Sequence, residues 1–331
     1  MVNTIYIEEK IRTFDRTKKI LSKFKNSRHI FIKQYSEIFN IKNQNFRIQK
    51  SNPSLILAFK SKNYVLKTPE GFGIGSKKNY YFSHMYNCIY DCRYCFLQGM
   101  YSSSNYVLFV NYENFIEKIN QIINENKNEE LTFFSGYDCD SLALEKITGF
   151  VSYFLPKIIF KTNSLFEFRT KSTQLEPFLK HQPNKNIIIA FSLLPEEVAS
   201  KLDHRTPSIS KRIMSIKTLS LNGWKIGLRF DPLIYHKNWK QNYEKLFQQI
   251  FSNLSVKNIH SISFGSLRFP KDMFKNIYKM YPEEKLFSYN FEIRNNYLSF
   301  DENLEKEMIE FCKSIVKKNN KNIPVFSCTP Y

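Results

Sequence analysis

Three cysteines that lie within eight residues, Cys88, Cys92 and Cys95, have the residue type and the spacing for metal chemistry. Thiolates on a compact loop are the ligands of iron–sulfur clusters. Three thiolates leave one iron of a four-iron cluster open, and that iron can bind a cofactor or a substrate. A structural zinc site usually closes with four ligands, often as paired Cys-x2-Cys units. The spacing therefore favours an iron–sulfur cluster; the alternatives are zinc completed by Cys139 or a histidine, and ordinary core cysteines.

The composition indicates a basic protein of the cytoplasm. The net charge is +19, and residues 1–80 hold 17 Lys and Arg against 5 Asp and Glu. Such a surface attracts polyanions, so we expect a nucleic acid, preferably DNA, as partner; the alternative is a solvated surface in a lysine-rich chain. No run of 18 uncharged apolar residues predicts a membrane span, and the N-terminus lacks the apolar stretch of a secretory signal. A reducing compartment also suits clustered thiols that bind metal.

Strand and helix patterns alternate after the cysteine loop. The expected strands cover residues 80–82, 131–134, 165–169, 187–191, 225–230 and 259–264. The expected helices cover residues 111–126, 141–155, 209 to about 222, 239–254 and 270–280. Six strand-then-helix units predict an α/β fold, a partial (βα)6 barrel. We expect a basic N-terminal α+β layer over residues 1–79, the barrel over residues 80–282 and a C-terminal extension over residues 283–331.

Polar residues follow several of the expected strands. They are the cysteine loop and residues 135–140, 170–172, 192 and 229–232. The chemistry of a βα barrel lies at the carboxyl ends of its strands. The sequence therefore predicts that these segments meet in one site.

The cysteine loop also resembles a known signature. Cys-x3-Cys-x2-Cys with an aromatic residue, here Tyr94, just before the last cysteine is similar to the motif of radical S-adenosylmethionine (SAM) enzymes. The resemblance implies a [4Fe–4S] cluster whose open iron holds SAM, and reductive cleavage of SAM to a 5′-deoxyadenosyl radical. The cofactors carry the difficult chemistry, and the protein positions and shields them.

Over residues 80–280 the chain more narrowly resembles the spore photoproduct lyase family. The resemblance rests on short segments in a matching order, residues 95–98, 140–149, 169–172, 191–192, 204–206, 230–234 and 265–270. It implies reversal of a pyrimidine photolesion in DNA and a reducing partner such as flavodoxin or ferredoxin. It also suggests SAM-binding residues, which are Tyr94, Asp140, Ser141, Lys171 and Ser192. Each has a plainer alternative: loop packing for Tyr94, a helix cap for Asp140 and Ser141, a surface position for Lys171 and a backbone contact for Ser192.

The residue that returns hydrogen to the product departs from the family pattern. Spore enzymes have a cysteine just after the second barrel strand, where this chain has Tyr137, with Cys139 two residues later. They also have a tyrosine directly after the third cluster cysteine, where this chain has Phe96, which lacks the O–H of a phenol. Tyr137, Cys139 and Cys328 are thus the candidate hydrogen donors. Two other functions stay open: a radical SAM enzyme that modifies RNA or another substrate, and a non-enzymatic nucleic-acid-binding protein stabilised by metal.

Overall fold

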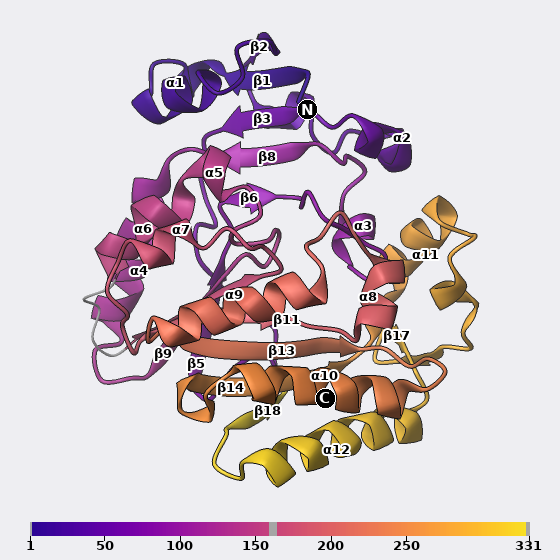
Figure 1. The fold of residues 1–331 in the computed structure, drawn as a ribbon. Coiled ribbons are helices and arrows are strands. Elements are labelled where there is room, and N and C mark those ends of the chain that lie inside the picture. Colours follow the sequence, from indigo (N-terminus) through magenta and orange to yellow (C-terminus); the bar gives the residue numbers. More distant parts are fainter. Residues whose placement is uncertain (1, 159–163, 329–331) are drawn as a thin grey trace.

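An eight-stranded sheet curls around the centre of the molecule in the computed structural model, which describes residues 2–158 and 164–328 (Figure 1). Six of its strands are parallel neighbours in chain order: β5 (Lys78–Phe82), β9 (Leu131–Ser135), β10 (Ser164–Thr170), β11 (Ile187–Ser192), β13 (Lys225–Leu233) and β14 (Ile259–Ser266). At the two edges, β18 (Val325–Ser327) pairs in parallel with β14, and β4 (Leu66–Lys67) pairs antiparallel with β5. The predicted α/β partial barrel is confirmed, with each of its six expected strands.

Amphipathic helices pack on the outside of this sheet (Figure 1). They include α4 (Tyr112–Glu125), α6 (Phe150–Ile158), α9 (Ile209–Leu221), α10 (Trp239–Asn253) and α12 (Glu302–Asn319). In α4, for example, Phe115, Ile119 and Ile122 are buried at helical spacing while the charged residues face outward. Shorter helices between the strands are α7 (Glu176–Leu179) and α8 (Glu196–Leu202).

The helix expected over residues 141–155 was wrong in its boundaries. Residues 140–144 form a loop, and the helical part is split into α5 (Glu145–Thr148) and α6. Gly149 separates the two with φ of +58°, a left-handed conformation that ends a helix and favours glycine. The conformation of the loop before α5 is set by the hydrogen bonds of Asp140 and not by a helix.

A second sheet forms a layer at the end of the molecule opposite α12 (Figure 1). Its strands, in spatial order, are β2 (Arg28–Ile32), β1 (Thr4–Glu8), β3 (Leu55–Ala58), β8 (Tyr106–Phe109) and β6 (Met85–Tyr86). Strands β1, β2 and β3 lie within the predicted N-terminal layer, whereas β6 and β8 come from later in the chain. Helices α1 (Asp15–Leu21) and α2 (Phe46–Ser51) belong to the same region. The division of the chain at residues 79 and 282 stays a prediction, and the layer takes strands from both sides of residue 79.

The C-terminal part adds a small antiparallel sheet and two helices to the barrel. The sheet has the order β15 (Arg268–Pro270), β17 (Tyr297–Ser299) and β16 (Glu292–Arg294), and α11 (Lys271–Met280) follows β15. Cys312 lies on α12 and is fully buried, as expected of a core residue. Among the described residues, no helix is both long and apolar enough to cross a membrane.

Candidate active site

The cysteine loop is anchored by contacts that do not involve its sulfur atoms. Within the loop, β7 (Asp91–Cys92) pairs antiparallel with β12 (Asp203–His204), and the Arg93 N–H donates to the Leu202 carbonyl at 2.9 Å. The Lys50 ammonium donates to the Tyr90 carbonyl at 3.3 Å from below the loop. The polypeptide itself therefore fixes where the three thiols lie.

A buried ion pair supports this anchor from behind. Arg212 and Asp203 pair at 2.7 Å, with side chains 0% and 1% exposed. The Tyr94 hydroxyl donates to the other oxygen of Asp203. Burial acts to raise the pKa of Asp203, but Lys171 and Arg212 outweigh it, and the pKa lies below its ordinary value. A charged Asp203 thus holds both the ring of Tyr94 and the strand that pairs with the loop.

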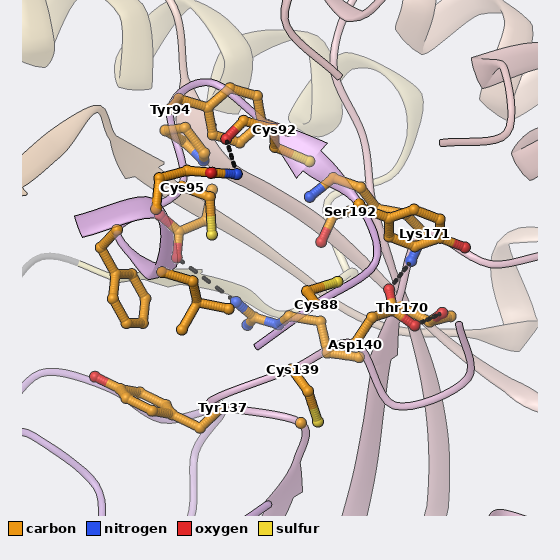
Figure 2. A pocket seen from close by; sticks show the side chains of 18 of the residues that line it. Cys88, Cys92, Tyr94, Cys95, Tyr137, Cys139, Asp140, Thr170, Lys171 and Ser192 are labelled. Atoms are coloured by element: carbon orange, nitrogen blue, oxygen red, sulfur yellow. Dashed lines mark hydrogen bonds and ion pairs between the residues drawn. The ribbon is translucent and has the colours of Figure 1, made fainter. Parts of the chain in front are cut away.

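The three thiols point into one pocket (Figure 2). Cys88, Cys92 and Cys95 are all free. No three metal-binding side chains in the described parts of the chain are close enough to share a single ion. Each thiolate of a four-iron cluster binds a different iron. Three free thiols that line one pocket therefore fit a cluster held at three of its four irons.

The pocket wall offers polar groups that the protein itself leaves without partners. Buried oxygens of Asn87, Gln98, Ser135 and Ser266 have no hydrogen-bond partner among the described residues, and all four residues line the pocket. Unpaired buried polar atoms are costly. The pocket is therefore suited to a polar ligand that would satisfy these oxygens.

Asp140 and Ser141 organise the loop that follows β9. One oxygen of Asp140 accepts from the backbone of Leu142 and Ala143, both at 2.9 Å, and from the Thr170 hydroxyl at 2.6 Å. Its other oxygen accepts from the Lys171 N–H at 2.7 Å. The Ser141 hydroxyl donates to the Ser135 carbonyl at 2.9 Å. Asp140 lines the pocket, but its contacts tie the loop to the end of β10.

Lys171 and Ser192 face the thiols from the ends of β10 and β11 (Figure 2). The Lys171 ammonium lies 5.3 Å from the centre of the Tyr94 ring. Burial acts to lower the pKa of Lys171, but Cys92 and Asp203 outweigh it, so the pKa is raised and the side chain is a cation. The Ser192 hydroxyl makes no hydrogen bond to a described residue, while its carbonyl accepts from Arg212 at 3.0 Å. The structure places both residues at the pocket, and both have groups free to bind a ligand.

Tyr137 and Cys139 lie on the other side of the pocket (Figure 2). The Tyr137 ring packs in a tilted arrangement 4.4 Å from Tyr81 and lies 5.7 Å from Phe96, measured between ring centres. Burial raises the pKa of Tyr137 to about 12 and raises that of the Cys139 thiol well above its ordinary value. Both side chains therefore keep their O–H or S–H hydrogen at neutral pH.

Cys328 lies apart from these groups. It is 2% exposed, and its N–H donates to the Phe264 carbonyl on β14 at 2.8 Å. Cys328 does not line the pocket that holds the three thiols. The site therefore brings two of the three candidate hydrogen donors to the thiols.

The sequence analysis gave no role to Gln98 or Arg268, although both line the pocket. Gln98 lies on α3 (Leu97–Met100), just after the last cysteine, and its amide donates to the Cys92 carbonyl at 3.4 Å. Arg268 follows β14, in a segment that was noted only for its resemblance. Its position directly after a barrel strand was the available signal.

A curled parallel sheet with a three-thiol loop after its first barrel strand is the architecture of the radical SAM class of iron–sulfur enzymes. The family model "Spore photoproduct lyase" matches residues 1–300. The chain therefore belongs to the spore photoproduct lyase family, whose members are radical SAM enzymes with SAM and a [4Fe–4S] cluster as cofactors.

Individual relatives agree with this assignment. A spore photoproduct lyase of Clostridium acetobutylicum is 27% identical over 209 residues, which are 63% of this chain and 62% of that protein. A spore photoproduct lyase of Bacillus subtilis is 23% identical over 288 residues, which are 85% of this chain and 83% of that protein.

Solved structures agree in fold. A spore photoproduct lyase mutant with bound AdoMet and dinucleoside spore photoproduct is 18% identical, with a TM-score of 0.84 over 100% of this chain and 98% of that one. A spore photoproduct lyase complexed with dinucleoside spore photoproduct gives a TM-score of 0.83 at 17% identity, with the same coverage.

Proposed function

We propose that this chain is a radical SAM lyase that reverses a pyrimidine photolesion in DNA. The observation that carries the proposal is the single pocket that joins the three free thiols, Lys171 and Ser192 at the carboxyl ends of the barrel strands. Membership of the spore photoproduct lyase family supports the kind of reaction, and the relatives' bound dinucleoside spore photoproduct supports the kind of substrate.

Different residues of the chain would hold the cluster and SAM. When bound, the cluster and SAM supply a 5′-deoxyadenosyl radical that abstracts hydrogen from the substrate. Cys88, Cys92 and Cys95 would hold the cluster, and the Lys171 ammonium would pair with the SAM carboxylate. Ser192 would donate its free hydroxyl to the same end of SAM, and Tyr94, fixed by Asp203, would flank it.

Asp140 and Ser141 would act on SAM indirectly. Their side chains are already bonded within the loop and to the end of β10, so they would position the backbone that lines the SAM site. This proposal differs from the expectation from the sequence, in which both residues were candidates for direct contact with SAM.

The charge and the thiols of the chain support the proposed DNA substrate, compartment and reducing partner. A chain of net charge +19 suits a DNA strand. A lesion must leave the base stack to reach a barrel mouth, and lesions do so at lower cost than intact bases. The six free cysteines suit the cytoplasm, where a flavodoxin or ferredoxin would reduce the cluster.

Ultraviolet-irradiated DNA tests the function directly. The reconstituted, reduced enzyme with SAM is expected to restore normal pyrimidines in irradiated DNA and to release 5′-deoxyadenosine, both measured by liquid chromatography with mass spectrometry. Irradiated RNA serves as the parallel substrate, because Phe96 and Tyr137 depart from the spore enzymes and favour a different substrate as the second candidate. Unchanged DNA together with altered bases in RNA would replace the first proposal with the second.

Tyr137 and Cys139 are the proposed hydrogen donors, because both line the pocket and both keep an exchangeable hydrogen. In D2O the wild-type enzyme is expected to place one solvent deuterium in the repaired base. Removing the true donor, by Tyr137→Phe or by Cys139→Ala, is expected to abolish this label and to slow repair at least about tenfold. The label is measured by mass spectrometry of the product.

Tyr278→Phe is the matched control for the phenol, because Tyr278 is exposed on α11, outside the pocket. It is expected to repair and to label as the wild type does. Full labelling at normal rates in both donor variants would refute the assignment, and Cys328→Ala would then be the remaining variant to examine.

A further inference from the structure

A closed ion pair lies inside the barrel beneath the pocket. Glu167 on β10 and Arg229 on β13 are both fully buried, and two hydrogen bonds of 3.1 and 2.7 Å join them. The remaining guanidinium N–H groups of Arg229 donate to the Leu228 carbonyl and to the carbonyl and hydroxyl oxygens of Ser261. Neither side chain of this pair is available to a ligand.

Above this pair, one carboxylate and two arginine side chains form a charged group on the pocket wall. Asp231 lies on β13, where it precedes Pro232 in a cis peptide bond, and its carboxylate faces Arg169 at 3.6 Å and Arg268 at 3.5 Å. These distances are longer than those of the pair below, and no hydrogen bond joins Asp231 to either arginine. The two arginine side chains are about one fifth exposed, at 21% and 19%.

Contacts within the protein hold the Arg169 side chain in place and leave part of its guanidinium group free to bind a ligand. Its Nε donates to Glu167 at 3.3 Å, which directs the other end of the guanidinium toward Asp231 and the pocket. The guanidinium also lies 5.2 Å from the centre of the Phe72 ring, so its flat face is supported. A guanidinium fixed in this way presents its N–H pair to a ligand at little entropic cost.

The charges of this group do not balance. Arg169, Arg229 and Arg268 carry three positive charges, and Glu167 and Asp231 carry two negative charges, so one positive charge is left over at the pocket surface. Lys171 stands apart from this count, because it would pair with the SAM carboxylate. An anion of one negative charge with two free oxygens would complete the group, and guanidinium groups bind phosphate oxygens in this bidentate way.

We propose that Arg169 and Arg268 bind the phosphodiester that links the two nucleosides of the lesion. This inference rests on the proposed function and deepens it. A phosphodiester has one negative charge and two unbridged oxygens, and it is the anion that joins two adjacent pyrimidines in a strand. The substrate class is then a phosphate-linked dinucleotide within a strand, in preference to a pair of nucleosides without the linking charge.

The test compares two probes that differ only in this charge. The probes are the spore photoproduct dinucleotide with its phosphodiester intact and the same dinucleotide as the neutral methyl phosphotriester. Their equilibrium binding to the reconstituted enzyme with SAM, without reductant, is measured by isothermal titration. The diester is expected to bind about tenfold more tightly than the triester. Arg268→Gln is expected to bring this ratio close to one, and Arg268→Lys, which keeps the charge, is expected to restore part of it.

Arg268 is the preferred position because Arg169 also contacts Glu167, so that its loss would affect folding. Arg47→Gln is the matched control: Arg47 lies on α2 outside the pocket, where it pairs with Glu283 at 2.8 Å. It should keep the wild-type ratio. Equal binding of the two probes to the wild type, or an unchanged ratio in Arg268→Gln, would overturn the proposal.

Adding reductant separates this proposal from the proposed function. If both probes are repaired with equal efficiency, the phosphate site is refuted while the lyase function stands. If the diester is preferred in binding but neither probe is repaired, the phosphate site stands and the lyase function on this lesion is refuted.

Discussion

Replacing Cys92 by alanine is expected to remove the iron–sulfur cluster and with it at least about a thousandfold of the SAM-cleaving activity. Cys92 lies on β7, and the pairing with β12 fixes its position in the pocket that Cys88 and Cys95 also line. Two remaining thiols cannot hold the cluster at three corners. Iron content, visible absorbance and 5′-deoxyadenosine release after anaerobic reconstitution are the measurements.

Cys312→Ala is the matched control for the loss of a cysteine. Cys312 is buried on α12, away from the pocket, and its removal should leave the iron content and the absorbance of the protein unchanged. A Cys92→Ala protein that kept its full iron content and released 5′-deoxyadenosine would contradict the ligand assignment and the function that depends on it.

The second large effect concerns the stability of the fold. Glu167→Gln is expected to lower the free energy of unfolding by about 3–5 kcal/mol, because Arg229 would remain as a buried charge without its counter-ion. Urea denaturation followed by circular dichroism measures the change. The double variant Glu167→Met with Arg229→Met should recover a large part of the loss, because it removes both buried charges at once.

A surface pair provides the control. Glu176→Gln removes a carboxylate that pairs with Lys180 on the exposed side of α7, and it should change stability very little. If Glu167→Gln were as mild as Glu176→Gln, the Arg229 guanidinium would have found another partner, and the interior pair would not stabilise the barrel.

The buried Glu167–Arg229 pair also determines how the stability of the fold depends on pH. Burial acts to raise the pKa of Glu167, but Arg229 and Arg169 outweigh it, and the pKa lies below its ordinary value of 4.5. A carboxyl group with a lowered pKa stabilises the folded state above its unfolded-state pKa, and this contribution is lost as the pH falls through the folded-state pKa. Below pH 4.5 the wild type should therefore lose stability more steeply than Glu167→Gln.

The sequence predicted the barrel because its strands are continuous apolar runs between helices of clear periodicity. Ile187–Ser192 is an example, since it is covered on both faces as such a run requires. The cluster loop was predictable because its three cysteines are neighbours in the chain. Local patterns of this kind need no knowledge of distant partners.

Features that depend on distant partners were missed. The strand β8 pairs with β3, about fifty residues earlier, and no local pattern indicates this pairing. Glu167 and Arg229 are charged residues within otherwise apolar strands, and only the closed sheet brings them together. Tyr94 was expected to bind SAM or to pack within the loop, and its contact with Asp203, which is 109 residues away, was not foreseen.

The anchoring of the cysteine loop has a consequence for how the holoenzyme is made. Its supports are the β7–β12 pairing, the Arg212–Asp203 ion pair and the Lys50 contact, and none of these requires iron. We therefore expect the polypeptide to keep the three thiols near one another even when the cluster is lost, so that rebuilding the cluster would not require the barrel to refold.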